Sequence, residues 1–185
     1  MTTTTAPAQV AAPTRRRFTV EEYYAMAEAG ILAANERVEL LNGEVFAMAP
    51  VGAAHGDITD LFDRFFQQSL PDRARVRVQG PVRIDDTTLL YPDLSALRLR
   101  PDYRRHLPEP GDMLLLIEVS DSSLRRDREA KLSLYAAAGI PEVWIANVPA
   151  CHVEAFHDPV DGVTRAIASS PPTAKSAPSP SPTSC

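Results

Sequence analysis

The stretch Met113-Leu-Leu-Leu-Ile-Glu-Val-Ser-Asp-Ser-Ser-Leu-Arg-Arg-Asp-Arg-Glu-Ala-Lys131 combines a strand, a turn and the start of a helix. Its first five residues are an uninterrupted apolar run, the pattern of a strand that is covered on both faces. The run ends in Glu118, and Ser122 or Ser123 can cap the helix that follows. The sequence therefore predicts a carboxylate at the end of a buried strand and an ammonium, that of Lys131, about two turns into the next helix.

Lys131 is the only lysine outside the Pro/Ser-rich C-terminal tail. Lysine is a compact ammonium whose pKa burial can change, whereas arginine is a wide fork that stays charged. On a helical wheel of residues 123–138, Lys131 lies among apolar side chains, where an ammonium is costly unless a carboxylate such as that of Glu118 meets it. The alternative is an ordinary surface pair between Asp127 and Lys131, with Glu118 merely ending a core strand.

Two further acidic residues stand out upstream. Asp93 follows Tyr91-Pro92 inside an apolar stretch, and a proline there marks a strand edge or a bulge, or else a Pro-Asp turn between two short strands. Glu39 precedes Asn42-Gly43, the strongest short signal for a hairpin, and so lies on the hairpin's first strand. An isolated glutamate on a strand usually faces solvent, so Glu39 by itself indicates little.

In chain order, Pro92-Asp93, Glu118-Val119 and Lys131 resemble the signature of the PD-(D/E)XK nucleases. Ser120 occupies the position where this signature usually has its lysine. The sequence therefore resembles the variant of the signature in which the lysine lies on the helix after the strand. A longer series resembles the Uma-two family, a bacterial group described as putative restriction endonucleases, from about Phe18 to about Asp161. That series adds Val38-Glu39-Leu40-Leu41-Asn42-Gly43-Glu44, His55, Asp127, Tyr135, Gly139-Ile140-Pro141-Glu142 and Trp144.

The resemblance implies a metal-dependent endonuclease that hydrolyses phosphodiester bonds of DNA. Asp93 and Glu118 would hold Mg²⁺ or Mn²⁺ with the backbone carbonyl of Val119, since these hard ions prefer oxygen ligands. Glu39 would complete the acidic cluster, directly or through water. Lys131 would orient or deprotonate the attacking water and neutralise charge in the transition state.

Two residues have supporting parts in this scheme. Asp127 would position Lys131. His55, at the start of a helix over residues 54–69, would either lie near the metal site or, the more usual role for a histidine before a core stripe, pack or cap. Apolar residues at helical spacing predict the inner stripe of that helix: Ile58, Leu61, Phe62, Phe65 and Phe66. The alternative function is a catalytically silent module of the same fold that binds nucleic acid or a protein partner.

The order of predicted elements favours an α/β fold with a restriction-endonuclease-like core, a central mixed β-sheet flanked by helices. Helices are expected over 19–29, 54–69 and 123–138, a hairpin over 38–49, and strands near 75–84, 89–97, 113–119, 142–147 and 152–157. This domain would span residues 18–168. The Thr/Ala/Pro-rich segment 1–17 and the Pro/Ser-rich tail 169–185 cannot bury a core and are predicted to be disordered.

Charge and targeting signals limit the partners. The net charge of −5 argues mildly against nucleic acid, but three arginine sets could line a groove or else be solvated faces: Arg73, Arg75 and Arg77; Arg98, Arg100, Arg104 and Arg105; Arg125, Arg126 and Arg128. The sequence shows no signal peptide and no membrane span, and it has only two cysteines, which predicts a cytoplasmic protein without membrane contact. A homodimer is expected if both strands of a DNA substrate are cut.

Overall fold

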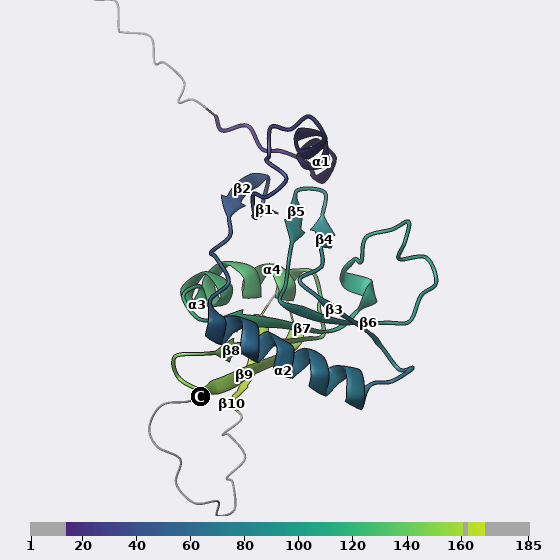
Figure 1. Cartoon of the computed structure of the whole chain (residues 1–185), viewed down its shortest axis with the longest axis vertical. Coiled ribbons are helices and arrows are strands. Elements are labelled where there is room, and N and C mark those ends of the chain that lie inside the picture. Colours follow the sequence, from purple (N-terminus) through teal and green to yellow (C-terminus); the bar gives the residue numbers. More distant parts are fainter. Residues whose placement is uncertain (1–13, 161–162, 169–185) are drawn as a thin grey trace, which may run out of the picture.

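The computed structural model describes residues 14–160 and 163–168 of the 185-residue chain. Most of the predicted N-terminal segment and all of the predicted C-terminal tail, with Cys185, lie outside these residues. The described part is an α/β fold with two sheets, each covered by helices (Figure 1).

The larger sheet has six strands and is mixed. Its order is β10-β9-β8-β7-β6-β3, with β7 and β8 parallel and every other neighbouring pair antiparallel. The strands are β3 (Arg75–Val78), β6 (Leu94–Leu97), β7 (Met113–Ser120), β8 (Glu142–Asn147), β9 (His152–Val160) and β10 (Val163–Ala168). β7 lies near the centre and is almost entirely buried, as its apolar run predicts.

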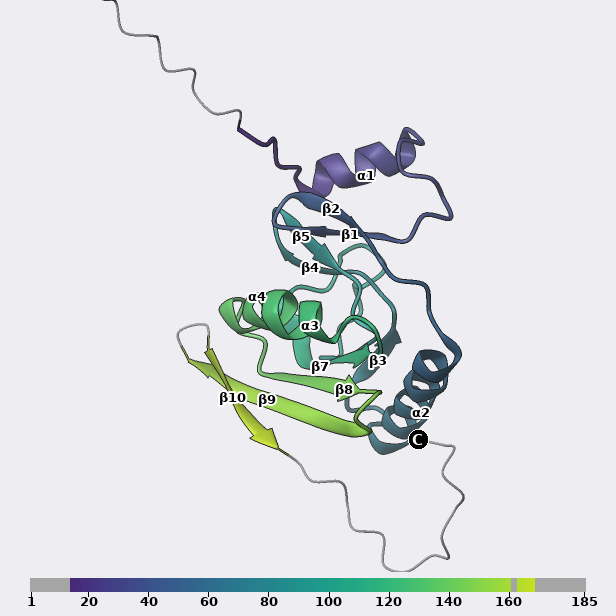
Figure 2. The ribbon, with the colours of Figure 1, turned by 90° about the vertical axis from the view of Figure 1, so that its left-hand side faces the viewer.

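Helices cover both faces of this sheet, and the alternation of side chains along β7 sorts its residues between them. Leu115 and Ile117 pack with Phe66 of α2 (Ala53–Ser69) on one face. Leu116 packs with Tyr135 on the other face, under a helical segment made of α3 (Leu124–Arg126), η2 (Asp127–Lys131) and α4 (Leu132–Ala137). Figure 2 shows α3 and α4 between the larger sheet and the smaller one.

The smaller sheet has four strands in the order β2-β1-β5-β4, all antiparallel. They are β1 (Val38–Leu41), β2 (Glu44–Ala47), β4 (Val82–Asp85) and β5 (Thr88–Leu90). α1 (Val20–Glu28) packs through Val20 and Tyr23 on its outer face. The predicted hairpin forms, with Asn42 at φ 51° and Gly43 at φ 77°, as a type I′ turn requires.

Two predicted strands are divided between the two sheets. The expected strand near 75–84 becomes β3 and β4, interrupted by Gln79-Gly80-Pro81, and the strand near 89–97 becomes β5 and β6, interrupted by Tyr91-Pro92-Asp93. A proline lacks the N–H that a ladder needs, so each interruption lets the chain leave one sheet and enter the other. Asp93 therefore lies where the two sheets meet.

The prediction for the inner stripe of α2 is partly wrong. Phe66 is buried, and Ile58 and Phe62 pack against buried clusters. Leu61 and Phe65 are 52% and 57% exposed, because the sheet covers a narrower arc of the helix than the apolar pattern spans. No helix in the described ranges has the length and apolar character needed to cross a membrane.

Candidate active site

Lys131 lies midway along the helical segment and is buried, with 3% of its surface exposed. Its ammonium lies 3.1 Å from Glu39 Oε2, 3.3 Å from Glu118 Oε1 and 3.9 Å from Asp127 Oδ1. Asp127 is itself only 2% exposed, so the pair is not the surface pair considered as the alternative. The buried ammonium thus contacts Glu39 of the smaller sheet and Glu118 of the larger one. These contacts offset the free-energy cost of burying its charge.

Lys131 and Asp127 are the two ends of η2, a single π-helical turn inside the predicted helix. Asp127 Oδ2 accepts hydrogen bonds from Ser120 Oγ at 2.7 Å and from Ser123 Oγ at 2.5 Å. Ser123 does occupy the N-cap position, but its hydroxyl is directed to Asp127 and makes no capping bond. The end of β7 is thus tied to the turn that carries Lys131. Such π turns often occur at functional sites.

Glu118 lies near the end of β7 and is 3% exposed. Its Oε1 accepts a hydrogen bond of 2.6 Å from the hydroxyl of Tyr135. Burial raises the pKa of Glu118 to about 8, against the opposing effect of the Lys131 ammonium. Burial also acts to lower the pKa of Lys131, but the surrounding carboxylates, Glu118 first, outweigh it and leave that pKa raised. The carboxylates around Lys131 thus favour its charged form.

Asp93 is fixed by three groups at the junction of the sheets and is 8% exposed. Its Oδ2 accepts a hydrogen bond of 2.8 Å from the backbone N–H of Val119, and its Oδ1 lies 3.1 Å from His55 Nε2. Gln79 Nε2 donates to the same Oδ1 at 3.4 Å. The hydrogen bond to Asp93 raises the pKa of His55, against the effect of its partial burial.

The structure places His55 beside Asp93, a predicted metal ligand, and not in a role of packing or capping alone. Gln79 was not predicted at all. The available signal was its position directly before Gly80-Pro81, where the strand pattern stops. Only the tertiary fold shows that this interruption lies beside Asp93.

Glu39 is fully buried on β1, on the opposite side of the strand from Val38 and Leu40, which pack with α1. Neither of its carboxylate oxygens accepts a hydrogen bond from the described residues. Instead, Oε2 faces Lys131, and Oε1 lies 3.7 Å from Nη1 of Arg126. Ion pairs thus offset the burial of this carboxylate, which the sequence pattern alone would place in solvent.

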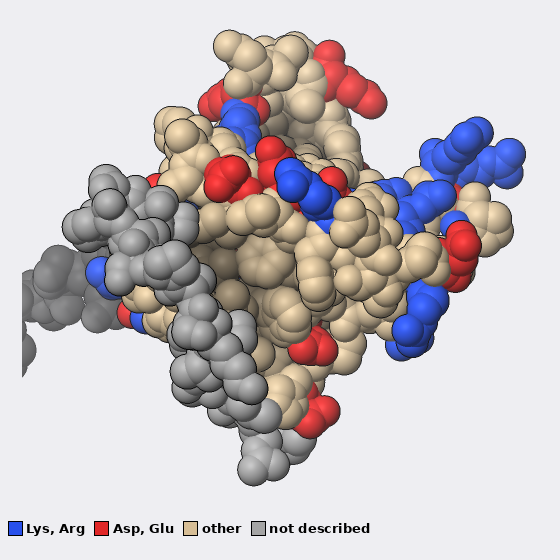
Figure 3. Space-filling model, turned by 60° about the horizontal axis from the view of Figure 1, so that its bottom comes forward, with Lys and Arg blue, Asp and Glu red and all other residues tan. Residues whose placement is uncertain are grey.

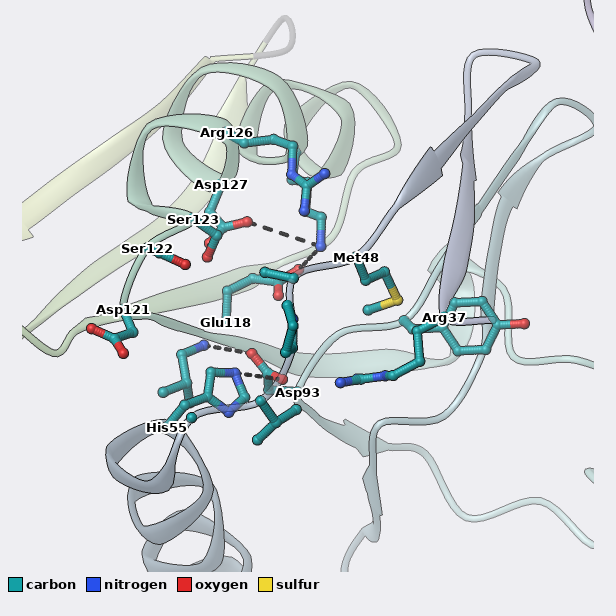
Figure 4. Close-up of a pocket in the computed structure, with 17 residues that line it drawn as sticks. Arg37, Met48, His55, Asp93, Glu118, Asp121, Ser122, Ser123, Arg126 and Asp127 are labelled. Atoms are coloured by element: carbon teal, nitrogen blue, oxygen red, sulfur yellow. Dashed lines mark hydrogen bonds and ion pairs between the residues drawn. The ribbon is translucent and has the colours of Figure 1, made fainter. Parts of the chain in front are cut away.

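A pocket opens above these groups (Figure 4). Its cavity volume is about 60 Å³, enough for at least two water molecules. Asp93, Glu118, Val119 and Lys131 line it, and the loop 48–52 between β2 and α2 forms another part of the wall. Glu39 is not among the lining residues, since it lies behind Lys131. Its direct contact with a metal stays a prediction.

The oxygen atoms of this pocket fit a hard divalent cation. Within the described ranges no three His, Cys, Asp or Glu side chains are grouped so as to hold a metal by themselves. Mg²⁺ does not need three, because it keeps several of its own waters and is often bound through one or two carboxylates. Asp93, Glu118 and Val119 all line the same small cavity, so the two carboxylates, with the Val119 carbonyl that the resemblance implies, would supply that donor set.

The arginine sets are separated by the fold. Arg75, Arg77 and Arg100 gather around the ring of Tyr103, with guanidinium carbons 5.5, 5.1 and 5.8 Å from its centroid. β3 begins at Arg75, so Arg73 precedes the strand that carries the other two arginines of its set. Figure 3 shows basic side chains concentrated toward one edge of the molecule. In the third set, Arg126 alone lines the pocket.

Comparison with known proteins agrees with this fold. The crystal structure of a putative nuclease belonging to DUF820 from Anabaena variabilis ATCC 29413 has a similar fold, with a TM-score of 0.60 and 14% sequence identity. The similarity covers 82% of this chain and 85% of that one. No curated protein matches the sequence.

The fold and the buried acidic pocket define a restriction-endonuclease-like α/β protein. The family model described as "Putative restriction endonuclease", Uma2, matches residues 20–182. The chain belongs to this family, which the ordered series of motifs predicted.

Proposed function

We propose that this protein is a metal-dependent endonuclease that hydrolyses phosphodiester bonds of DNA. Membership of a family of restriction-endonuclease type and the fold shared with a protein titled as a nuclease both support this function. The observation that carries the proposal is the convergence of Asp93, Glu118 and Lys131 in one small pocket. Asp93 directly precedes β6, Glu118 lies on the neighbouring β7, and Lys131 comes from the helical segment that follows.

The residue types suit the reaction. Phosphodiester hydrolysis needs an activated water and positive charge to balance the pentavalent transition state. Asp93, Glu118 and the Val119 carbonyl would hold Mg²⁺ or Mn²⁺, which when bound would supply Lewis acidity and a more acidic water.

Lys131 supplies a fixed positive charge beside the same carboxylates. Because carboxylates of Glu39, Glu118 and Asp127 surround its ammonium and favour the charged form, we assign it to orienting the attacking water and balancing phosphate charge rather than to removing a proton. Glu39 holds the ammonium from behind, Asp127 fixes the turn that carries it, and Tyr135 orients Glu118. His55 and Gln79 orient Asp93.

A catalytically silent module is the second candidate, and one observation favours it. Each acid of the pocket already has partners in the protein: Glu118 binds Tyr135 and Lys131, and Asp93 binds His55 and the Val119 N–H. A site that only keeps its own charges balanced would have the same contacts. Such a module would bind nucleic acid or a protein partner without cutting.

Nicking of supercoiled plasmid distinguishes the two. The purified protein is incubated with Mn²⁺, Mg²⁺ or EDTA beside Lys131→Ala and Glu118→Gln, and Asp60→Asn, which changes an exposed carboxylate of α2 away from the pocket, serves as the acidic control. The nuclease predicts metal-dependent nicking that both pocket variants lose and the control keeps. Equal nicking by all variants would indicate a contaminant, and no cleavage of plasmid, single strands or RNA by a folded protein would favour the silent module.

Cutting both strands of a duplex at one place requires two sites, so we also propose a homodimer. Light scattering at high protein concentration, with and without DNA, tests it. A monomer under both conditions would contradict it.

A further inference from the structure

Two arginines line the pocket from different parts of the chain, and the scheme above does not use either of them. Arg37 directly precedes β1, and Arg126 ends α3. Figure 4 shows their side chains entering the pocket from different sides, with the carboxylates between them.

Each of the two arginines lines both the pocket and a neighbouring hollow. Arg126 also lines a hollow of about 580 Å³, together with Ser122, Ser123, residues 47–49 and the ion pair of Arg125 with Glu129. Arg37 also lines a second hollow of about 210 Å³, with Gln79 and Tyr91. Met48 lines all three spaces. They therefore adjoin one another as a groove, which we call the Arg37–Arg126 groove, with the acidic pocket in its middle.

The guanidinium groups of these two residues keep donors for a ligand. Within the described residues, no hydrogen bond or ion pair reaches the guanidinium of Arg37. Arg126 makes only long contacts, 3.7 Å to Glu39 and 3.5 Å to the carbonyl of Ala47. Arg125 and Arg128 of the same helical segment differ, because they are paired with Glu129 and Glu154.

We propose that the Arg37–Arg126 groove binds an extended sugar-phosphate backbone, with the two arginines on the phosphates that flank the one held in the acidic pocket. A planar guanidinium binds a phosphate through two hydrogen bonds, and it does so without reading the base. This inference rests on the proposed function, since it takes the acidic pocket as the position of the bond to be cut. It explains how a chain of net charge −5 holds nucleic acid.

Binding without cleavage tests the groove separately from catalysis. Fluorescence anisotropy is measured with a fluorescein-labelled single strand and with the matching duplex, in EDTA, over a series of salt concentrations. The protein is Asp93→Asn, and Arg37→Gln and Arg126→Gln are added to it singly and together. Arg64→Gln is the matched control, because Arg64 is exposed on α2 and does not line the groove.

Each groove variant is expected to weaken binding about tenfold, the loss of one charge-assisted contact. It should also reduce the slope of log K against log salt by about 0.7 for the single strand or about 0.9 for the duplex. The double variant should lose both contacts, and Arg64→Gln neither. Whichever nucleic acid shows the larger arginine effect is the form that enters the groove.

Several results would overturn the proposal. One is that the groove variants bind with the same affinity and the same salt slope as Arg64→Gln. Another is that the parent protein, Asp93→Asn, binds neither the single strand nor the duplex. Thermal unfolding of each variant and the charge-retaining Arg126→Lys separate a loss of contact from a loss of fold. If the native protein cuts DNA but the groove variants bind like the control, the proposed role of the groove is contradicted and the proposed nuclease function is supported. If binding depends on both arginines but no cleavage occurs, the proposed role of the groove is supported and the proposed nuclease function is contradicted.

Discussion

The hydroxyl of Ser120 donates a hydrogen bond of 2.7 Å to Asp127 Oδ2, and this bond connects the end of the central strand to the π turn that carries Lys131. Ser120 occupies the position at which the PD-(D/E)XK signature, which the sequence resembles, usually has its lysine. The serine therefore does not reach the pocket but fixes the segment from which Lys131 reaches it.

Asp127→Ala should destabilise the protein by about 1–3 kcal/mol, because it leaves the hydroxyls of Ser120 and Ser123 without their acceptor. Urea unfolding measures this change. Asp121→Ala, which removes an exposed carboxylate from the same pocket, is the control and should change stability by about 0.5 kcal/mol or less. Equal stabilities of the two variants would show that Asp127 does not anchor the turn.

Lys131→Met should be more damaging still, by about 3–5 kcal/mol, because it leaves Glu39 and Glu118 buried without their shared cation. Adding Glu39→Gln should restore part of that loss, since it removes one of the two uncompensated charges. A double-mutant cycle in the free energy of unfolding gives the coupling. Additive effects would mean that the 3.1 Å contact between Lys131 and Glu39 contributes little.

Tyr135→Phe should weaken metal binding about 10- to 100-fold while the protein stays folded, because Glu118 loses the hydroxyl that orients it. Isothermal titration with Mn²⁺ measures this. Tyr103→Phe is a matched control: it removes another buried hydroxyl, one that donates to the carbonyl of Arg98 and does not line the pocket. A weaker affinity in both variants would point to a general effect on the fold.

Metal ions should raise the melting temperature of the native protein, and EDTA should reverse the effect. A ligand at 100 times its Kd adds about 2.7 kcal/mol to stability. Asp93→Asn and Glu118→Gln should lose the Mn²⁺-dependent shift, whereas Glu129→Gln should keep it. A shift that survives both pocket substitutions would place the metal elsewhere.

Stability should depend on pH through Glu154, which Arg128 holds by two hydrogen bonds. The bond to Arg128 lowers the pKa of this carboxyl below its ordinary value of 4.5, against the effect of partial burial. The pair therefore contributes above about pH 4.5, and the contribution is lost as the pH falls through the lowered pKa. Because Arg128 is 42% exposed, we expect only about 0.5–1 kcal/mol.

Urea unfolding of native protein and Glu154→Gln between pH 7 and pH 3 checks this. The difference in free energy of unfolding should shrink toward low pH. A difference that stays constant over the range would mean that the ion pair does not account for the effect of Glu154.

The sequence alone determined the family and most of the local elements, but not the division of two expected strands between the sheets. The apolar run of 113–117 dictates a buried strand because it offers no polar face, and Asn42-Gly43 dictates the hairpin because its turn needs positive φ at both residues. Lys131 could be predicted as a buried ammonium, since it stands on an apolar face beside a strand that ends in a carboxylate.

The tertiary structure decided which distant groups meet. Nothing local distinguishes Glu39 from a glutamate that faces solvent; it is buried because the smaller sheet packs on the helical segment and presents that side of β1 to Lys131. Gln79 and His55 reach Asp93 only because two interrupted strands pass between the sheets there. Periodicity fixes which side of an element is apolar, but how much of that side is covered, and by what, depends on contacts between segments far apart in the chain.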